Sequence, residues 1–149
     1  MRKSVRTGQI SLSDATMTFG RVAGLSDDTS VHQLTVTSED AAAVAALPPG
    51  SALLIVQRGG TTGERFLLDA PAVVAGRSVK ADIFFDDVTV SRKHAEFQRV
   101  PSGYAVRDIG SLNGTYVNRQ RIEGQTLLSS GDEVQIGKFK MSYQHSPHA

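Results

Sequence analysis

Short runs of apolar residues separated by turn residues occupy the chain from residue 51 onward. Residues 52–57 (ALLIVQ) are apolar and partly β-branched, and residues 95–100 and 104–108 flank a Pro-Ser-Gly turn typical of a hairpin. The other predicted strands are 65–68, 72–75, 83–85, 115–117, 121–122, 126–128, 134–136 and 139–143. About eleven short strands with frequent turn signals and no convincing helix predict an all-β sandwich or barrel.

The first 48 residues follow a different pattern, rich in Ser, Thr, Asp, Gly and Ala and poor in bulky apolar residues. Of six Phe and three Tyr residues, only Phe19 precedes residue 66. Such a segment buries too little apolar surface to offset the entropy of ordering it. Residues 1–48 are therefore predicted to be a flexible, largely disordered N-terminal tail.

Residues 38–46 (SEDAAAVAA) have a weak helical signal within this tail. A helix this short is marginal by itself, so a frayed linker is the preferred interpretation. Pro48-Pro49-Gly50 marks the predicted boundary, since Pro and Gly interrupt regular structure. We expect a β domain over residues 49–145 and a disordered end at residues 146–149.

Composition and charge exclude several classes of function. The 149 residues carry 16 Lys and Arg against 15 Asp and Glu, a net charge of +1 that argues against a nucleic-acid partner. The chain has no cysteine, which excludes disulfides, thiolate nucleophiles and Cys-ligated zinc. No apolar run approaches the ~18 residues of a membrane-spanning helix, so no membrane contact is predicted. The basic N-terminus lacks the apolar stretch of a secretory signal, and we expect a cytoplasmic protein.

Three predicted loops hold the residues suited to binding. They are residues 76–78 (GRS), 91–94 (SRKH) and 110–115 (GSLNGT). Together they offer guanidinium groups, hydroxyls, a carboxamide and backbone N–H groups, which are the groups that bind an anion with several oxygens. Loops on a rigid β scaffold commonly hold such sites, so we expect the three to meet at one end of the sandwich.

The set Gly76-Arg77, Ser91-x-x-His94 and Asn113-Gly114 resembles the signature of the forkhead-associated (FHA) domain, a phosphothreonine-peptide-binding module. The resemblance covers roughly residues 50–145 and implies an FHA-type β-sandwich. Residues 82–92, 110–119 and 131–139 are very similar to one actinobacterial branch, that of the glycogen accumulation regulators and oxoglutarate dehydrogenase inhibitors.

The resemblance to this branch implies a metabolic switch rather than an enzyme. The unphosphorylated domain would bind and regulate oxoglutarate dehydrogenase and enzymes of glutamate metabolism. A serine/threonine protein kinase would phosphorylate an N-terminal threonine, and the domain would then bind its own phosphorylated tail and release the enzymes.

The resemblance also assigns residue roles. Arg77 would fork onto the phosphate, Ser91 would donate its hydroxyl to it, and Asn113 would hold the peptide backbone after the phosphothreonine. The full set of expected phosphothreonine-binding residues is Arg77, Ser91, Arg92, Ser111, Leu112 and Asn113, and the expected structural supports are Gly76, His94, Gly114 and Thr115.

The tail motif differs from that of the branch. The branch has Glu-Thr-Thr-Ser-Val-Phe, and residues 27–32 here are DDTSVH, so that Thr29 matches the second threonine while Asp28 replaces the first. Thr29 is the predicted phosphorylation site, with Thr35 and Thr37 as open alternatives. A flexible tether of ~20 residues spans roughly 25 Å, which makes docking in cis geometrically accessible.

Other functions are weighed against this one. The departures at Asp28 and His32 favour an adaptor that recruits phosphothreonine partners in trans, such as a kinase or its substrate. A hydrolase built on Ser91, His94 and Asp108 lacks a nucleophile-elbow pattern. Four scattered histidines without cysteine give no metal-ligand spacing, and no metal or cofactor is predicted.

Overall fold

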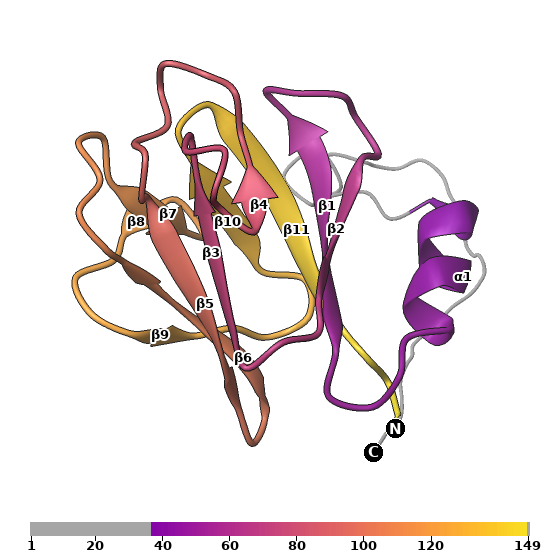
Figure 1. Ribbon diagram of the computed structural model, residues 1–149. Helices are drawn as coiled ribbons and strands as arrows, with labels where there is room; N and C mark the ends of the chain where they lie inside the picture. Colours follow the sequence, from indigo (N-terminus) through magenta and orange to yellow (C-terminus); the bar gives the residue numbers. More distant parts are fainter. Residues whose placement is uncertain (1–36, 149) are drawn as a thin grey trace. The chain divides into compact units, whose positions relative to one another are not determined.

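The structure, a computed structural model, describes residues 37–148 as one helix followed by eleven strands in two sheets (Figure 1). The elements are α1 (Ser38–Ala45), β1 (Ala52–Arg58), β2 (Arg65–Leu68), β3 (Ala72–Gly76), β4 (Ile83–Phe84), β5 (Ala95–Val100), β6 (Gly103–Asp108), β7 (Thr115–Val117), β8 (Gln120–Arg121), β9 (Thr126–Leu127), β10 (Glu133–Ile136) and β11 (Phe139–His145). The predicted all-β sandwich of about eleven strands is confirmed.

The strands form a six-stranded sheet in the order β2-β1-β11-β10-β7-β8 and a five-stranded sheet in the order β4-β3-β5-β6-β9. Neighbouring strands pair antiparallel, except that β3 and β4 pair in parallel. The antiparallel pairing brings the loops that connect these strands to the two ends of the sandwich.

The core lies between the two sheets and follows from the two-residue period of the strands. In β1, Leu54 and Val56 point into this core. The largest buried side chains include Tyr104 and Tyr143, whose hydroxyls both have partners: Tyr143 accepts from the Tyr104 N–H at 3.0 Å, and Tyr104 donates to the Ala70 carbonyl at 2.7 Å. Burial raises the pKa of Tyr143 to about 12, so this link stays protonated at neutral pH.

Residues 38–45 form the helix α1, so the preferred interpretation of this stretch as a frayed linker is wrong. Thr37 is the N-cap and accepts a hydrogen bond from the Asp40 N–H at 3.0 Å. The buried carboxylate of Asp40 pairs with Arg65 of β2 at 2.8 Å. The helix also covers Leu53 and Ile55 on the outer face of the six-stranded sheet. These tertiary contacts supply the stability that an isolated eight-residue helix lacks.

The expectation of a disordered end is also wrong for residues 146–148, which form hydrogen bonds with residues 45–51. Ser146 is buried, its N–H donates to the Ser51 carbonyl at 2.8 Å, and its hydroxyl donates to the Leu47 carbonyl at 3.0 Å. The His148 ring lies 2.6 Å from the Ala45 carbonyl oxygen. Residues 146–148 thus hold the connection between α1 and β1 in place, and helix α1 lies before the predicted boundary at residues 48–49.

Candidate functional site: three loops at one end of the sandwich

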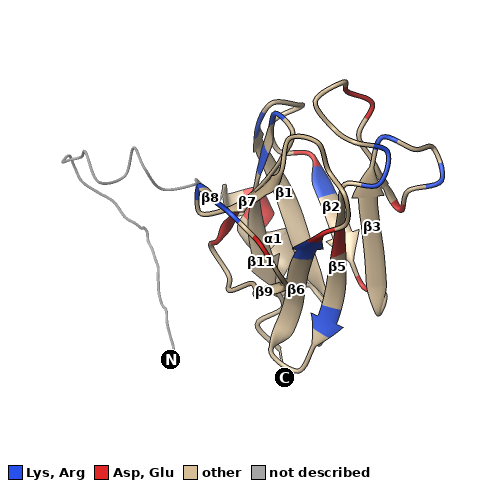
Figure 2. Cartoon of the chain, turned by 90° about the vertical axis from the view of Figure 1, so that its left-hand side faces the viewer, with Lys and Arg blue, Asp and Glu red and all other residues tan. Residues whose placement is uncertain are grey.

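The register of the five-stranded sheet aligns the three loops predicted to bind a ligand. Ala75 of β3 pairs with Ala95 of β5, and Ala95 pairs in turn with Asp108 of β6. One loop leaves β3 just after Ala75, one enters β5 just before Ala95, and one leaves β6 at Asp108. The three loops therefore meet at the same end of the sandwich, where Figure 2 shows basic segments with acidic ones among them.

Arg77, in the first loop, is hydrogen-bonded to the second loop. Its backbone N–H donates to the Ser91 carbonyl at 2.9 Å, and its Nε donates to the Val90 carbonyl at 3.0 Å. The side chain is exposed, and its two terminal nitrogens form no hydrogen bond with residues 37–148. The guanidinium is thus held in one direction while its outer donors face solvent.

Ser91 and Asn113 join the second loop to the third. The Ser91 hydroxyl accepts from the Leu112 N–H at 2.9 Å, and the Asn113 amide donates to the Thr89 carbonyl at 3.0 Å. Leu112 makes this contact with its backbone N–H, and the residue as a whole is 84% exposed. Arg92 is also exposed, and its carbonyl accepts from the Ser78 N–H at 3.2 Å.

His94 is fully buried beneath these loops. Its Nδ1 accepts from the Ser91 N–H at 3.1 Å, which leaves the proton on Nε2 to donate to the Gly114 carbonyl at 2.8 Å. The ring therefore contacts the backbone of Ser91 and not its hydroxyl. A triad of Ser91, His94 and Asp108 is excluded, because Asp108 binds other partners.

Asp108 organises the third loop. Its carboxylate accepts from the Ser111 N–H and the Gly110 N–H, both at 2.9 Å, from the Thr115 hydroxyl at 2.8 Å and from the Ser111 hydroxyl. The Ser111 hydroxyl accepts in turn from the Gly114 N–H at 2.8 Å. Burial by itself raises the pKa of Asp108, but the donors of Ser111, Gly110 and Thr115 outweigh it and lower the pKa to about 2.

This depressed pKa predicts a pH-dependent contribution of Asp108 to stability. The native carboxylate titrates at about 2 rather than at the ordinary 3.8, so its stabilisation is complete above pH ~4 and is lost as the pH falls toward 2. Asp108→Asn is expected to lower the free energy of unfolding by about 1–2 kcal/mol at pH 7, since the side chain is partly exposed. Urea denaturation of both proteins from pH 7 to pH 2 measures this, and the difference should shrink below pH 4. An equal difference at every pH would contradict the assignment to the carboxylate charge.

Two glycines permit the close packing of the loops. A Cβ on Gly76 would lie 1.9 Å from the Arg92 carbonyl oxygen. Gly114 has a φ of +91°, and a Cβ there would lie 2.8 Å from Nε of Arg121. Gly76 is therefore required by its contact with a backbone carbonyl, and Gly114 by its left-handed φ, which a residue with a side chain rarely adopts.

A groove beside Asn113 involves residues that the sequence patterns did not single out. It is lined by Thr89, Asn113, Tyr116, Gln135, Gly137 and Lys138. Asp87 accepts from the Thr89 N–H at 2.8 Å and pairs with the Lys138 ammonium at 2.8 Å, while the Lys138 N–H donates to the Thr89 hydroxyl at 2.9 Å. The hydrogen bond from Lys138, helped by those from Thr89, lowers the pKa of Asp87 to about 2.

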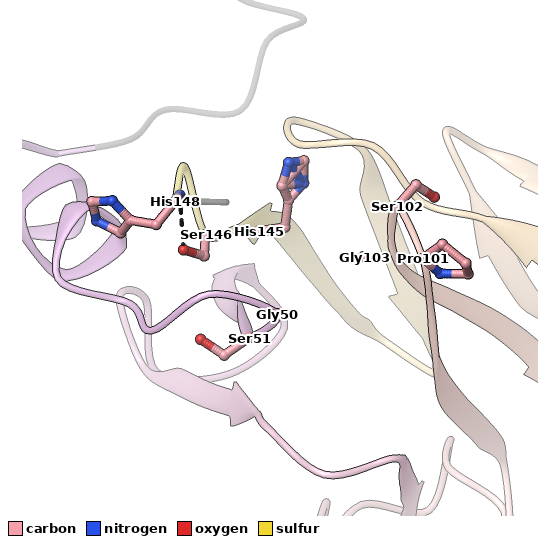
Figure 3. Close-up of a pocket in the computed structure, with 8 residues that line it drawn as sticks. All are labelled: Gly50, Ser51, Pro101, Ser102, Gly103, His145, Ser146 and His148. Atoms are coloured by element: carbon pink, nitrogen blue, oxygen red, sulfur yellow. Dashed lines mark hydrogen bonds between the residues drawn. The ribbon is translucent and has the colours of Figure 1, made fainter.

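A second pocket lies at the other end of the five-stranded sheet, by the turn between β5 and β6 (Figure 3). It is lined by Gly50, Ser51, Pro101, Ser102, Gly103, His145, Ser146 and His148, none of which belongs to the predicted site. The hydroxyls of Ser51 and Ser146 are already bound to the carbonyls of Pro48 and Leu47. Burial lowers the pKa of His145, which favours the neutral form of its ring.

The FHA-domain model matches residues 73–137, which include all three loops. The chain is also 56% identical over 102 residues to the oxoglutarate dehydrogenase inhibitor of Corynebacterium diphtheriae, an alignment that covers 68% of this chain and 71% of that protein. The chain belongs to the FHA family. The glycogen accumulation regulator GarA of Mycolicibacterium smegmatis is 56% identical over 104 residues, covering 70% of this chain and 65% of that protein.

A solved FHA structure supports the same assignment. Mycobacterium tuberculosis EmbR, in complex with a low-affinity phosphopeptide, is 30% identical and superimposes with a TM-score of 0.60, covering 67% of this chain and 26% of that chain. In the described part of this FHA protein, no helix is long and apolar enough to cross a membrane. Residues 37–148 contain no group of three or more His, Asp or Glu able to hold a metal ion.

The structure thus brings together all ten predicted site residues in three adjoining loops, the last residue of β3 and the start of β7. Thr29 and Thr35 lie outside the described residues. Thr37, the remaining alternative for the phosphorylation site, is the N-cap of α1.

Proposed function

We propose that this FHA protein is a non-enzymatic, cytoplasmic regulator of oxoglutarate dehydrogenase and of enzymes of glutamate metabolism. The observation that supports this most directly is the 56% identity to an oxoglutarate dehydrogenase inhibitor over 102 residues. The likeness to a glycogen accumulation regulator points to the same area of metabolism.

The proposed ligand of the three loops is a phosphothreonine peptide. The two terminal nitrogens of Arg77 have no hydrogen-bond partner among residues 37–148, so they are able to donate one hydrogen bond each to two phosphate oxygens. Ser91 has a hydroxyl proton that no described residue uses, and Arg92 adds positive charge beside it. The Asn113 amide would contact the peptide backbone, in exchange for its present bond to Thr89.

Phosphorylation of Thr29 by a serine/threonine kinase is the proposed switch. In the unmodified chain the three loops are open to the target enzymes. A phosphate on Thr29 supplies a ligand within the same chain, at an effective concentration near millimolar for a short flexible tether. Self-docking then removes the loops from the enzymes.

Phosphorylation of Thr29 is therefore expected to abolish inhibition of oxoglutarate dehydrogenase. The full chain would be assayed with the dehydrogenase complex before and after phosphorylation, and its amide NMR spectrum recorded in both states. We expect relief of inhibition together with shifts at Arg77, Ser91 and Asn113 that do not change on dilution. Thr29→Ala, treated with the same kinase, is the matched control and should remain an inhibitor.

An adaptor that binds phosphothreonine partners in trans is the second candidate, favoured by the replacement of the first threonine of the tail motif by Asp28. An unshifted spectrum after phosphorylation, combined with binding of an external phosphothreonine peptide, would support the adaptor. Undiminished inhibition by the phosphorylated chain would contradict the switch.

A further inference from the structure

Asn113 and Gly114 form an Asn-Gly pair in the third loop, and such a pair has a reactivity of its own. The side-chain carbonyl carbon of an asparagine, Cγ, can be attacked by the backbone nitrogen of the next residue. A glycine in second place has no side chain to block the approach and leaves the backbone free to turn. Asparagine is for this reason one of the residues that heat damages most readily. The pair is therefore a candidate site of chemical modification.

The two residues of the pair differ in burial. Asn113 is exposed, whereas Gly114 is buried. The Gly114 N–H donates to the Ser111 hydroxyl at 2.8 Å, and the Gly114 carbonyl accepts from Nε2 of His94 at 2.8 Å. The nitrogen that would attack is thus buried and hydrogen-bonded, while the amide that would leave belongs to an exposed residue.

The Asn113 side chain is held as well. Its Nδ2 donates to the Thr89 carbonyl at 3.0 Å, which ties it to the loop between β4 and β5. The Ser111 hydroxyl that accepts from Gly114 also donates to the carboxylate of Asp108. Freeing the Gly114 nitrogen therefore requires a local opening of the third loop, away from the closed arrangement of the structure.

We propose that Asn113 is a site of spontaneous deamidation, and that the hydrogen-bond chain from Asp108 through Ser111 to Gly114 sets its rate. When the loop opens, the Gly114 nitrogen gives its proton to solvent and forms a bond to Cγ of Asn113. The Cγ–Nδ2 bond breaks, the departing NH2 group takes up a proton, and ammonia leaves. Water then opens the resulting cyclic imide at either of its carbonyls, which gives aspartate or isoaspartate in place of asparagine.

Deamidation permanently inactivates the proposed phosphothreonine site. This consequence rests on the proposed function, because Asn113 is there proposed to contact the peptide backbone. A carboxylate at position 113 has no amide proton to donate, and its negative charge repels a phosphate bound at Arg77. Isoaspartate also adds a carbon to the main chain directly before Gly114, whose φ is +91°.

A bound phosphothreonine peptide slows the reaction. In the proposed complex the Asn113 amide exchanges its bond to Thr89 for one to the peptide, and the ligand holds the three loops together. The open form, from which the reaction proceeds, is less populated because the ligand binds the closed form. Occupied molecules therefore keep their site, and molecules that stay empty lose it with time.

The chain contains one other asparagine, Asn118, which is an internal control. It is exposed like Asn113, so exposure does not distinguish the two. The Asn118 Nδ2 donates to Asp132 at 3.1 Å, and its Oδ1 accepts from the Glu133 N–H at 2.9 Å. The residue that follows is Arg119, whose side chain obstructs the attack. A difference in rate between the two asparagines therefore reports on the glycine and on the loop.

Incubation of the unphosphorylated full chain at mildly alkaline pH tests the proposal. A synthetic peptide of residues 108–119 is the unprotected reference, and tandem mass spectrometry measures the gain of one mass unit at Asn113 and at Asn118. We expect rapid modification of Asn113 in the peptide, modification about tenfold or more slower in the chain because the closed loop holds the nitrogen, and none at Asn118 in the chain. Equal rates for Asn113 in the chain and in the peptide would overturn the protective role of the loop.

Two serine variants separate local opening from general instability. Ser111→Ala removes the acceptor of the Gly114 N–H and should raise the rate at Asn113 about fivefold, the effect of one lost hydrogen bond on the population of the open loop. Ser146→Ala is the matched control, because it removes a hydroxyl that donates to the Leu47 carbonyl at 3.0 Å at the other end of the sandwich. This variant should leave the rate unchanged.

A phosphothreonine peptide with the sequence of residues 24–34 gives two further readouts. Saturating the chain with it should slow modification of Asn113 about fivefold or more, since the ligand binds the closed form. The deamidated chain, which ion exchange separates by its added negative charge, should bind the peptide about tenfold or more weakly than the unmodified chain. Equally tight binding by the two forms would overturn the inactivation.

The outcomes also distinguish this inference from the proposed function. If Asn113 stays unmodified in both the wild type and Ser111→Ala, it is not a deamidation site and the inference is overturned. Equal acceleration in Ser111→Ala and Ser146→Ala would mean that the reaction requires general unfolding, which overturns control by the loop. If Asn113 reacts as expected but the unmodified chain does not bind the peptide, the proposed function is wrong and the deamidation site stands.

Discussion

Replacing Arg77 with alanine is expected to weaken binding of a phosphothreonine peptide by about 30- to 150-fold. The reason is the loss of a charge-assisted fork onto the phosphate, a contact of about 2–3 kcal/mol. Because the Arg77 side chain is exposed, its truncation should change the thermal midpoint of unfolding little. Isothermal titration of the unphosphorylated full chain with the peptide measures the effect.

Two arginine variants make this result specific. Arg77→Lys keeps the charge but not the planar fork, and should fall between the wild type and the alanine variant. Arg107→Ala removes the same charge from an exposed arginine that pairs with Glu96 at 2.7 Å, and should bind the peptide normally. Equal losses in Arg77→Ala and Arg107→Ala would indicate a general charge effect and contradict a phosphate site at Arg77.

Replacing Gly76 with alanine is expected to destabilise the domain by about 2–4 kcal/mol. The added Cβ would lie 1.9 Å from a backbone carbonyl oxygen of Arg92 and 3.1 Å from that of Ser91, so relief requires the loops to separate. The free energy of unfolding from urea denaturation measures this. Phosphothreonine-peptide binding should weaken at the same time, because Arg77 and Ser91 are held by the backbone that must move.

Gly124→Ala is the matched control. A Cβ at Gly124 meets no atom within 4 Å, and the position has no left-handed φ. This variant is expected to change the free energy of unfolding by no more than about 0.5 kcal/mol. A Gly76→Ala protein as stable as Gly124→Ala would show that the β3–β4 and β4–β5 loops are not packed as described.

Much of the architecture was predictable from the sequence because its signals are local. Consecutive apolar and β-branched residues predict the strand at residues 52–58. The Pro-Ser-Gly turn predicts the β5–β6 hairpin. The three loops were likewise found from residue types and spacing alone. Their meeting at one end followed from antiparallel strands, and the register of Ala75, Ala95 and Asp108 bears this out.

The errors concern segments whose order depends on distant partners. Helix α1 is too short to form alone, and the Asp40–Arg65 pair that holds it joins residues 25 positions apart. The C-terminal Ser146 bonds to Leu47, 99 positions away. Neither partner is visible in a local window of sequence.

The all-β class, the candidate binding loops and the resemblance to the FHA family could all be inferred from the sequence, because side-chain periodicity and turn residues act over a few positions. The folding of α1, the ion pair between Lys138 and Asp87, and the buried Glu133 Oε2, which has no donor among residues 37–148, became visible only in the folded chain. These features arise from burial and hydrogen bonding between segments far apart in the chain, and such contacts exist only once the two sheets have packed.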